Sequence, residues 1–222
     1  MLKAENITKT YNGRKVLNEV SLEIRSEIKA LIGVNGSGKS TFLKIVAGIV
    51  VPDKGRVLFS DGDVTEKPPE QRNFGYVPQH PALFQHLTVE DNIRYGLRNG
   101  RGSEESFRKA VELLDLKEEL KKKPRELSGG YQSRTSLARA LVSQPRVILL
   151  DEPLSGMDVA LKDKILPEFR IALKAADVPV LFVTHDAGEA EIVADSFAVI
   201  KDGVVRELDN SEEAFKFMST SN

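Results

Sequence analysis

Residues 33–40 have the types and spacing of a loop that binds phosphate, reading GVNGSGKS. Glycines let the backbone N–H groups curl around anionic oxygens, and a helix beginning near Ser40 adds its positive end. Lys39 could reach the β- and γ-phosphates of a nucleotide, while the Ser40 hydroxyl could ligate Mg²⁺. An apolar strand at residues 28–32 and helical spacing after the loop argue against the alternative, a glycine turn that binds nothing.

A second element supplies acidic groups at the end of an apolar run. Residues 147–150 are all apolar and predict a buried strand, and Asp151 and Glu152 follow it. We expect Asp151 to hold Mg²⁺ and Glu152 to polarise a water molecule as a general base. Alone, such a pair is commonly a solvated strand end. Beside a phosphate loop, the catalytic interpretation is favoured.

A third element, residues 127–132, reads LSGGYQ. Ser128 is placed to cap a helix that carries Leu137, Ala138 and Leu141, and a hydroxyl with free N–H groups at a helix start forms an anion site. An ordinary capped helix is the alternative. Because the chain already has one phosphate site, the second one invites the interpretation that it completes the site of another copy.

Composition limits the classes of protein to which the chain can belong. The 222 residues carry 32 Lys and Arg against 33 Asp and Glu, a net charge of −1, so no overall basic field favours nucleic acid or anionic lipid. Cysteine is absent, which excludes disulfides and thiolate sites. Apolar runs are far shorter than the ~20 residues of a membrane span. The first ten residues lack the apolar core of a signal peptide, so a cytoplasmic location is expected.

The elements that position these groups follow from apolar periodicity. Alternation at residues 20–24 and 57–59 predicts β-strands in the first quarter, and residues 80–140 read as a mainly helical insertion with Ser103 as an N-cap. From Val147 onward, short strands alternate with helices, which predicts a parallel sheet with helices on both faces.

Three further local features carry structural expectations. Pro167 should kink or interrupt a helix over residues 161–175. The Asp-Gly pair at residues 202–203 predicts a hairpin. Ser211 is expected to cap a last amphipathic helix that passes through Phe215 and Met218.

Taken together and in order, these motifs resemble those of the nucleotide-binding subunit of ABC transporters over nearly the whole chain. The matching segments are residues 33–40 (Walker A), 76–79 (Q-loop), 127–132 (signature), 151–153 (Walker B with its catalytic glutamate), 155–158 (D-loop) and 184–186 (switch histidine). The resemblance implies an α/β, P-loop NTPase (ABC ATPase) fold with a mainly parallel sheet core, an N-terminal antiparallel β subdomain and an inserted helical subdomain. It implies one domain, 1–222, with the core at 1–79 and 141–222 and the helical subdomain at 80–140.

The resemblance also implies an ATPase that uses Mg²⁺ and sandwiches two ATP molecules in a head-to-tail homodimer, or in a dimer of paired subunits. The implied catalytic residues are Glu152, His185 and Gln79, and the implied metal residues are Ser40, Gln79 and Asp151. The implied nucleotide contacts are Tyr11 on adenine, Asn35, Gly36, Ser37, Gly38, Lys39, Ser40 and Thr41 in the loop, and Ser128, Gly129 and Gly130 from the other copy. Structural roles remain as alternatives: Tyr11 as a half-buried strand tyrosine, His185 as a strand-end histidine and Gln79 as a loop residue.

Two motifs depart from the family's usual pattern. Tyr131 stands where the signature usually has glutamine, which leaves open the contact around the partner's ribose, and residues 156–157 depart from the usual D-loop. Neither change removes a catalytic group.

Residues 68–97 look most like importers of molybdate, tungstate, sulfate, iron(III) or sugars, and the short form most resembles molybdate and tungstate import ATPases. The resemblance then implies a peripheral subunit at the cytoplasmic face of the membrane that works through ATP-driven dimerisation. Its partners would be a second copy, transmembrane permease subunits and, indirectly, a substrate-binding protein, with no nucleic acid. Alternatives are an importer of another solute, an exporter, and a non-transport ABC ATPase acting on ribosomes or DNA. A subunit without turnover is opposed by Glu152 and His185.

Overall fold

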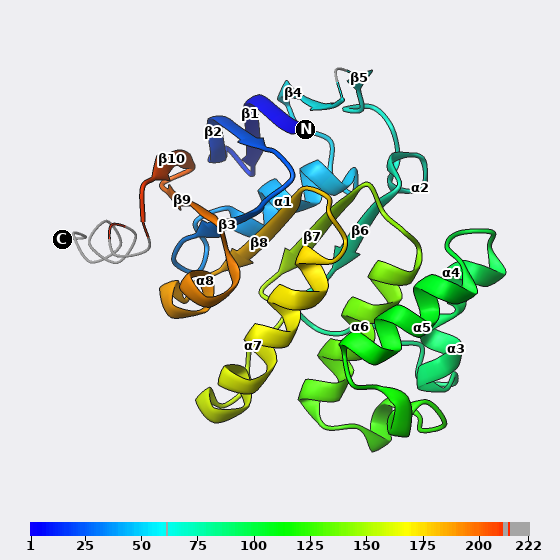
Figure 1. Ribbon diagram of the computed structural model, residues 1–222. Coiled ribbons are helices and arrows are strands. Elements are labelled where there is room, and N and C mark those ends of the chain that lie inside the picture. The colour runs from blue at the N-terminus through cyan, green and yellow to red at the C-terminus, as the bar shows by residue number, and fades with distance from the viewer. Residues whose placement is uncertain (61, 211–212, 214–222) are drawn as a thin grey trace.

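The computed structural model describes residues 1–60, 62–210 and 213, which form two sheets and the helices that cover them (Figure 1). The strands are β1 (Leu2–Tyr11), β2 (Arg14–Ile24), β3 (Ile28–Ile32), β4 (Lys54–Phe59), β5 (Gly62–Asp63), β6 (Phe74–Val77), β7 (Val147–Asp151), β8 (Val180–Thr184), β9 (Ser196–Lys201) and β10 (Val204–Leu208). The helices are α1 (Lys39–Ala47), α2 (Pro69–Arg72), α3 (Val89–Ile93), α4 (Tyr95–Arg98), α5 (Glu104–Leu113), α6 (Gly129–Val142), α7 (Val159–Lys174) and α8 (Ala187–Val193), with 3₁₀ turns at Lys117–Glu119 and Pro124–Glu126. The helix predicted after Ser211 lies outside the described residues.

The larger sheet has the strand order β10-β9-β3-β8-β7-β6, and its pairings are parallel except that of β9 with β10. Every residue of β3, β7 and β8 is buried, which explains why these segments are near-continuous apolar runs. Along β7, Val147 and Leu149 pack into one core, while Ile148 and Leu150 pack into the other. The predicted parallel sheet, covered on both faces, is confirmed.

The N-terminal strands form a separate antiparallel sheet in the order β2-β1-β4-β5. Its inward residues, such as Ile7 and Leu22, share a core with Phe42 and Val46 of α1 and with one face of the larger sheet. Helix α1 therefore lies between the two sheets. The predicted antiparallel N-terminal sheet is confirmed.

Residues 78–146, all of which the structure describes, contain helices and no strand. Ser103 caps α5 as predicted: its Oγ accepts from the Ser106 N–H at 3.0 Å, and Ser106 Oγ accepts from the Ser103 N–H at 2.9 Å. Figure 1 shows these helices, in green, gathered at one side of the molecule beside α7. The limits of a helical subdomain at 80–140 stay a prediction.

Helix α7 runs without interruption through Pro167, so of the two predicted effects of this proline the interruption is wrong, and the kink stays a prediction. Figure 1 shows α7 as one continuous helix. Proline lacks the N–H for one helical hydrogen bond. Ile165, Leu166 and Phe169 on the same helix are nevertheless buried in the core, and packing supplies most of a helix's stability in a protein. Burial of this face therefore outweighs the local preference of proline.

The predicted hairpin at the end of the larger sheet is confirmed, since β9 and β10 pair on either side of Asp202 and Gly203. Both turn residues have positive φ, 51° and 75°, as a tight two-residue turn requires. The turn also touches the N-terminal sheet, because the Gly203 carbonyl accepts from the Asn18 N–H at 2.8 Å.

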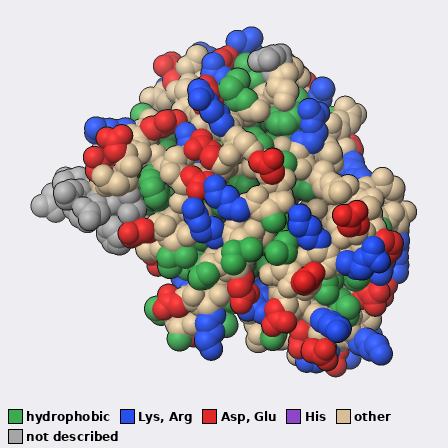
Figure 2. All heavy atoms as spheres, in the orientation of Figure 1, with side chains coloured by type: hydrophobic (Ala, Val, Ile, Leu, Met, Phe, Trp, Pro, Cys, Tyr) green, Lys and Arg blue, Asp and Glu red, His purple; other side chains and the backbone are tan. Residues whose placement is uncertain are grey.

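The surface carries charges of both signs. Figure 2 shows basic and acidic side chains interspersed over one face of the molecule, with hydrophobic side chains scattered among them. Among the described residues, no helix combines the length and the apolar character needed to cross a bilayer.

Candidate functional site

The phosphate-binding loop joins β3 to α1. Strand β3 ends at Ile32, and α1 begins at Lys39 with Gly38 as its N-cap. Gly33 passes so close to the backbone of Ile200 that a Cβ would lie 2.6 Å from the carbonyl oxygen. Gly38 has a φ of 105°, a conformation that residues with a side chain rarely adopt. The predicted order of strand, glycine loop and helix is confirmed.

The side chain of Lys39 is buried within the loop itself. Its Nζ donates to the carbonyl oxygens of Gly33 at 2.8 Å and Val34 at 3.0 Å. The same ammonium lies 3.2 Å from Glu152 Oε1, and both side chains are less than a tenth exposed. One lysine therefore joins the loop to the acidic end of β7.

Asp151 lies at the end of β7 against the start of α1. Its Oδ1 accepts a 2.8 Å hydrogen bond from Ser40 Oγ, and its Oδ2 accepts one from the Tyr76 hydroxyl at 3.2 Å. Burial and the neighbouring Asp151 raise the pKa of the Tyr76 phenol, which keeps it protonated and donating. Serine and carboxylate oxygens thus meet at one point, as the sequence predicts for a magnesium site.

Glu152 follows Asp151 in a left-handed conformation with a φ of 45°, which is uncommon for a residue with a side chain. Its Oε2 lies 2.9 Å from His185 Nδ1 and 3.5 Å from Gln79 Nε2. Its other oxygen faces Lys39. The three predicted catalytic side chains therefore meet at one carboxylate.

Sheet topology explains this convergence. The loop follows β3, His185 follows β8, Asp151 ends β7, and Gln79 comes two residues after β6. These strands are neighbours and parallel, in the order β3-β8-β7-β6. Their carboxyl ends meet at one edge, where open α/β sheets place their ligand sites.

A cavity of about 310 Å³ opens at this edge. Its lining consists of Val16, Asn35, Gly36, Gly38, Lys39, Ser40, Thr41, Gln79 and Glu152. Eight of these nine residues are ones that the sequence singles out. The cavity therefore combines the loop with the predicted base.

Two residues of this region were missed as site residues by sequence reasoning. Val16 reaches the cavity from β2 of the other sheet, and a lone valine in a hairpin strand carries no chemical signal. Tyr76 contacts Asp151 from the neighbouring strand β6. Its signal, a hydroxyl within a strand that leads to Gln79, was available in the sequence.

Tyr11 lies apart from the cavity lining. It ends β1, is 43% exposed, and has Lys9 Nζ 5.6 Å from its ring centroid. Lys9 therefore lies over one face of the ring, and the ring as a whole is partly exposed to a partner. The contact with adenine stays a prediction.

The signature residues do not join this chain's own cavity. Ser128 is the N-cap residue of α6, but its hydroxyl makes no capping hydrogen bond with the described residues. A Cβ on Gly129 would meet no described atom within 4 Å, whereas one on Gly130 would lie 2.8 Å from Ile165 Cδ1. The hydroxyl of Ser128 and the backbone at Gly129 are thus accessible at the start of a helix, and their role stays a prediction.

The groups at the cavity fit a nucleotide phosphate with Mg²⁺. Ser37 Oγ, in the loop, is buried and has no hydrogen-bond partner among the described residues, so it is able to bond to a ligand. No cluster of three or more acidic or histidine side chains that could hold a metal occurs in the described part of the chain. Magnesium does not need one, since it commonly takes one or two protein ligands together with phosphate oxygens.

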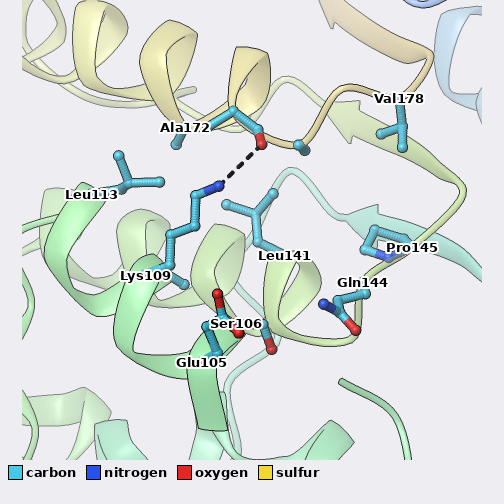
Figure 3. Close-up of a pocket in the computed structure, with 12 residues that line it drawn as sticks. Glu105, Ser106, Lys109, Leu113, Leu141, Gln144, Pro145, Ala172 and Val178 are labelled. Carbon is cyan, nitrogen blue, oxygen red and sulfur yellow. Dashed lines mark hydrogen bonds between the residues drawn. The ribbon is translucent and has the colours of Figure 1, made fainter. Parts of the chain in front are cut away.

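A second hollow, of about 440 Å³, lies where α5, the end of α6 and the end of α7 approach one another (Figure 3). Lys109 extends across it from α5, and its Nζ is 3.5 Å from the Ala175 carbonyl oxygen. Gln144 and Pro145 in its lining precede β7, and Val178 precedes β8. This hollow is therefore at the amino ends of these strands, opposite to the phosphate loop.

Comparisons with known sequences identify relatives of the chain. The profile of the ABC transporter family matches residues 17–155. The chain is 46% identical over 198 residues to the molybdate/tungstate import ATP-binding protein WtpC of Archaeoglobus fulgidus. This alignment covers 88% of this chain and 82% of that protein. It is 38% identical to the spermidine/putrescine import ATP-binding protein PotA of Marinobacter nauticus, over 97% of this chain. The chain spans only 59% of the length of that second relative.

Solved structures resemble the chain over nearly its whole length. A nucleotide-free ATP-binding cassette from an ABC transporter superposes with a TM-score of 0.85 at 28% identity, covering 100% of this chain and 95% of the other. A dimeric ATP-binding cassette in a post-hydrolysis state, bound to ADP and Pi, gives a TM-score of 0.79 at 31% identity, covering 94% and 98%. The chain therefore belongs to the ABC transporter family of ATPases, whose cofactors are ATP and Mg²⁺.

Proposed function

We propose that the chain is the ATP-hydrolysing subunit of an importer for an oxyanion of the molybdate or tungstate type. The observation that carries the ATPase part is the convergence of Lys39, Glu152 and His185 at the carboxyl edge of the sheet. The proposed substrate class is supported by the 46% identity to a molybdate/tungstate import protein. Import is argued from relatives that are themselves import proteins.

The chain's own residues divide the work of hydrolysis. Lys39 and the loop N–H groups bind the phosphates, and Ser40, Asp151 and Gln79 are the candidates to hold Mg²⁺. Mg²⁺ supplies positive charge that neutralises the phosphate oxygens. Glu152 is the candidate general base.

The second oxygen of Glu152 is suited to that role by its neighbours. Oε1 is taken by Lys39, which leaves Oε2 beside His185 and Gln79. A water held at Oε2 could give its proton to the carboxylate, while His185 and Gln79 orient it.

A second copy of the chain is part of this proposal. Ser128 and Gly129 are accessible at the start of α6 and do not line the chain's own cavity. Placed against the loop of another copy, their N–H groups and hydroxyl would add donors to the phosphates. A similar solved structure that is dimeric and bound to ADP and Pi supports the pairing of two copies.

The remaining partners follow from transport. We propose transmembrane permease subunits as direct partners, a substrate-binding protein as an indirect one, and a peripheral position at the cytoplasmic face of the membrane. Nucleic acid is not expected as a partner, in keeping with the net charge of −1 and the mixed charges on the face that Figure 2 shows. We also propose one domain, with the core at 1–79 and 141–222 and a helical subdomain at 80–140.

Uptake measurements test the transported substrate. In cells that lack the gene, radiolabelled molybdate and tungstate uptake should fall to background, and the intact gene should restore it while Glu152→Gln should not. Uptake of sulfate and spermidine, measured in the same cells, should be unchanged. Loss of spermidine uptake alone would favour the function named for the second relative.

Co-purification separates transport from the rival ATPase function. The tagged chain should bring down membrane subunits from detergent extracts. Ribosomes or DNA in their place would overturn the transport proposal.

A further inference from the structure

Glu189 is a buried carboxylate outside the mechanism given above. It lies in the first turn of α8 and is 5% exposed. Its Oε1 lies 2.6 Å from Lys162 Nζ on α7, and its Oε2 accepts a 2.6 Å hydrogen bond from Thr184 Oγ1. Both of its oxygens are therefore engaged, one by a cation and one by a hydroxyl.

Thr184 connects this carboxylate to the catalytic edge. It is the last residue of β8, directly before His185. Its Oγ1 also accepts from the Asp186 N–H at 3.0 Å, and its carbonyl accepts from the Gly33 N–H at 3.3 Å. The side chain of Thr184 thus bonds to the residue on the far side of His185. The backbone of Thr184 bonds to the phosphate loop.

Lys162 connects the same carboxylate to the start of α7. Asp158, the N-cap of α7, accepts from the Leu161 N–H at 3.0 Å through its side chain and from the Lys162 N–H at 3.1 Å through its carbonyl. Residues 155–158, the segment with the D-loop pattern, lead directly into this cap. The ion pair therefore joins the first turn of α7 to the first turn of α8.

We propose that Lys162 and Glu189 are positioning residues, which act through Thr184 to hold His185 against Glu152 and to tie its place to the start of α7. The role in turnover rests on the proposed ATPase function, whereas the effect on His185 itself does not. A displacement of residues 155–158 would move Lys162, and the buried pair would transmit it to α8. The pair is largely shielded from solvent, with the Lys162 side chain 15% and the Glu189 side chain 5% exposed.

Histidine resonances give a direct readout. The chain has three histidines, His80, His86 and His185, so a side-chain nitrogen spectrum is simple, and His185→Ala identifies the signals of His185. In Glu189→Gln the His185 signals should shift or broaden, while those of His80 and His86 stay in place. Glu168→Gln is the matched control, because Glu168 lies on α7 and pairs with Arg134 at 2.7 Å. It should leave all three histidines unchanged.

Kinetics supply the second readout. Glu189→Gln should lower kcat about 10-fold with the KM for ATP within about twofold, since a small misplacement of a catalytic group costs turnover more than binding. Glu168→Gln should stay within about twofold of the parent in both. If removing one charge prevents folding, the Lys162→Met/Glu189→Gln double variant carries the same test, because it leaves no unpaired buried charge.

The outcomes are distinguishable. Unchanged His185 signals in a folded Glu189→Gln or double variant, with kcat equal to that of Glu168→Gln, would overturn the inference. A parent chain that hydrolyses no ATP would overturn the proposed function, and the histidine spectra would still decide the positioning role.

Discussion

The ammonium of Lys39 lies among three oxygens, two from the loop backbone and one from Glu152. Phosphate oxygens would compete for the same ammonium, and hydrogen bonds to charged groups are the strong ones. We expect Lys39→Ala to weaken ATP binding at least ~100-fold, the scale of one such bond lost with its charge. Titration calorimetry measures this. Lys44→Ala, one turn further along α1, is the control, and parent-like affinity in Lys39→Ala would contradict the phosphate loop.

Glu152→Gln separates binding from chemistry. An amide has nearly the shape of the carboxylate but cannot accept a proton, so turnover should fall at least ~10²-fold while ATP and Mg²⁺ still bind. Steady-state hydrolysis and calorimetry on the same preparation check both parts. The ATP-filled variant should also elute as a dimer on gel filtration. Undiminished hydrolysis would place the general base elsewhere.

At the scale of single residues, the sequence predicted the groups but not all of their contacts. Ser40 with Asp151, and Glu152 with His185, meet as expected, because adjacent parallel strands bring their carboxyl ends together. Val16 could not be found, since it comes from another sheet and has no reactive group. The roles of Tyr11 and Ser128 depend on molecules other than this chain and stay predictions.

At the scale of elements, Arg72 fastens the far end of α1. Its guanidinium donates to the carbonyl oxygens of Ile45 at 3.0 Å and Val46 at 2.8 Å, in the last turn of α1. It also donates to Lys67 at 2.7 Å and Thr65 at 2.7 Å. Directly after Arg72 and Asn73, β6 leads toward Gln79. One buried side chain thus connects the helix of the phosphate loop to the segment that carries a catalytic candidate.

Removing this side chain should destabilise the fold. Arg72→Met leaves four carbonyl oxygens without this donor in a buried place, so we expect the free energy of unfolding to fall by about 3 kcal/mol. Urea unfolding followed by circular dichroism measures it. Arg56→Met is the control, because Arg56 is exposed and pairs with Glu5 on the surface, and its loss should cost at most ~1 kcal/mol. An unchanged urea midpoint in Arg72→Met would show that water replaces the guanidinium.

Element types were easier to predict than their behaviour under packing. Strands β7 and β8 were visible as apolar runs, and α5 was visible from Ser103 and the helical spacing behind it. The interruption predicted at Pro167 does not occur, and a local rule about proline could not show this because it says nothing of the buried face formed by Ile165 and Phe169. Local sequence patterns predict which segments form helices and strands. Burial in the core decides whether a helix tolerates an unfavourable residue such as proline.

At the scale of the whole molecule, the proposed site is shared between two chains. Ser128→Arg should leave ATP binding to one chain intact, since Lys39 and Ser40 are untouched, but its bulk should prevent closure of the pair. Lys39→Ala should have the opposite defect, because it leaves Ser128 intact but binds ATP poorly. Each variant alone should therefore have little activity.

A mixture of the two variants tests the sharing. In a mixed pair one composite site carries both defects and the other carries neither. Random pairing should then restore up to about a quarter of parental activity, provided that one intact site turns over alone. ATP hydrolysis against mixing ratio measures this. A mixture that never exceeds the sum of its parts, together with a fully active Ser128→Arg, would reduce residues 127–132 to an ordinary helix start.

The start of α6 gives this sharing a thermodynamic consequence. Ser103 uses its hydroxyl to cap α5, whereas the hydroxyl of Ser128 makes no such bond with the described part of α6. A capping bond adds about 1 kcal/mol to a helix, so the single chain forgoes that stability. Under the proposed pairing, the Ser128 hydroxyl forms a hydrogen bond to the nucleotide of the second copy. The bond that the monomer lacks is therefore formed in the dimer. The same hydroxyl can stabilise either the helix or the dimer. A change that makes Ser128 cap α6 would therefore stabilise the monomer and weaken the dimer.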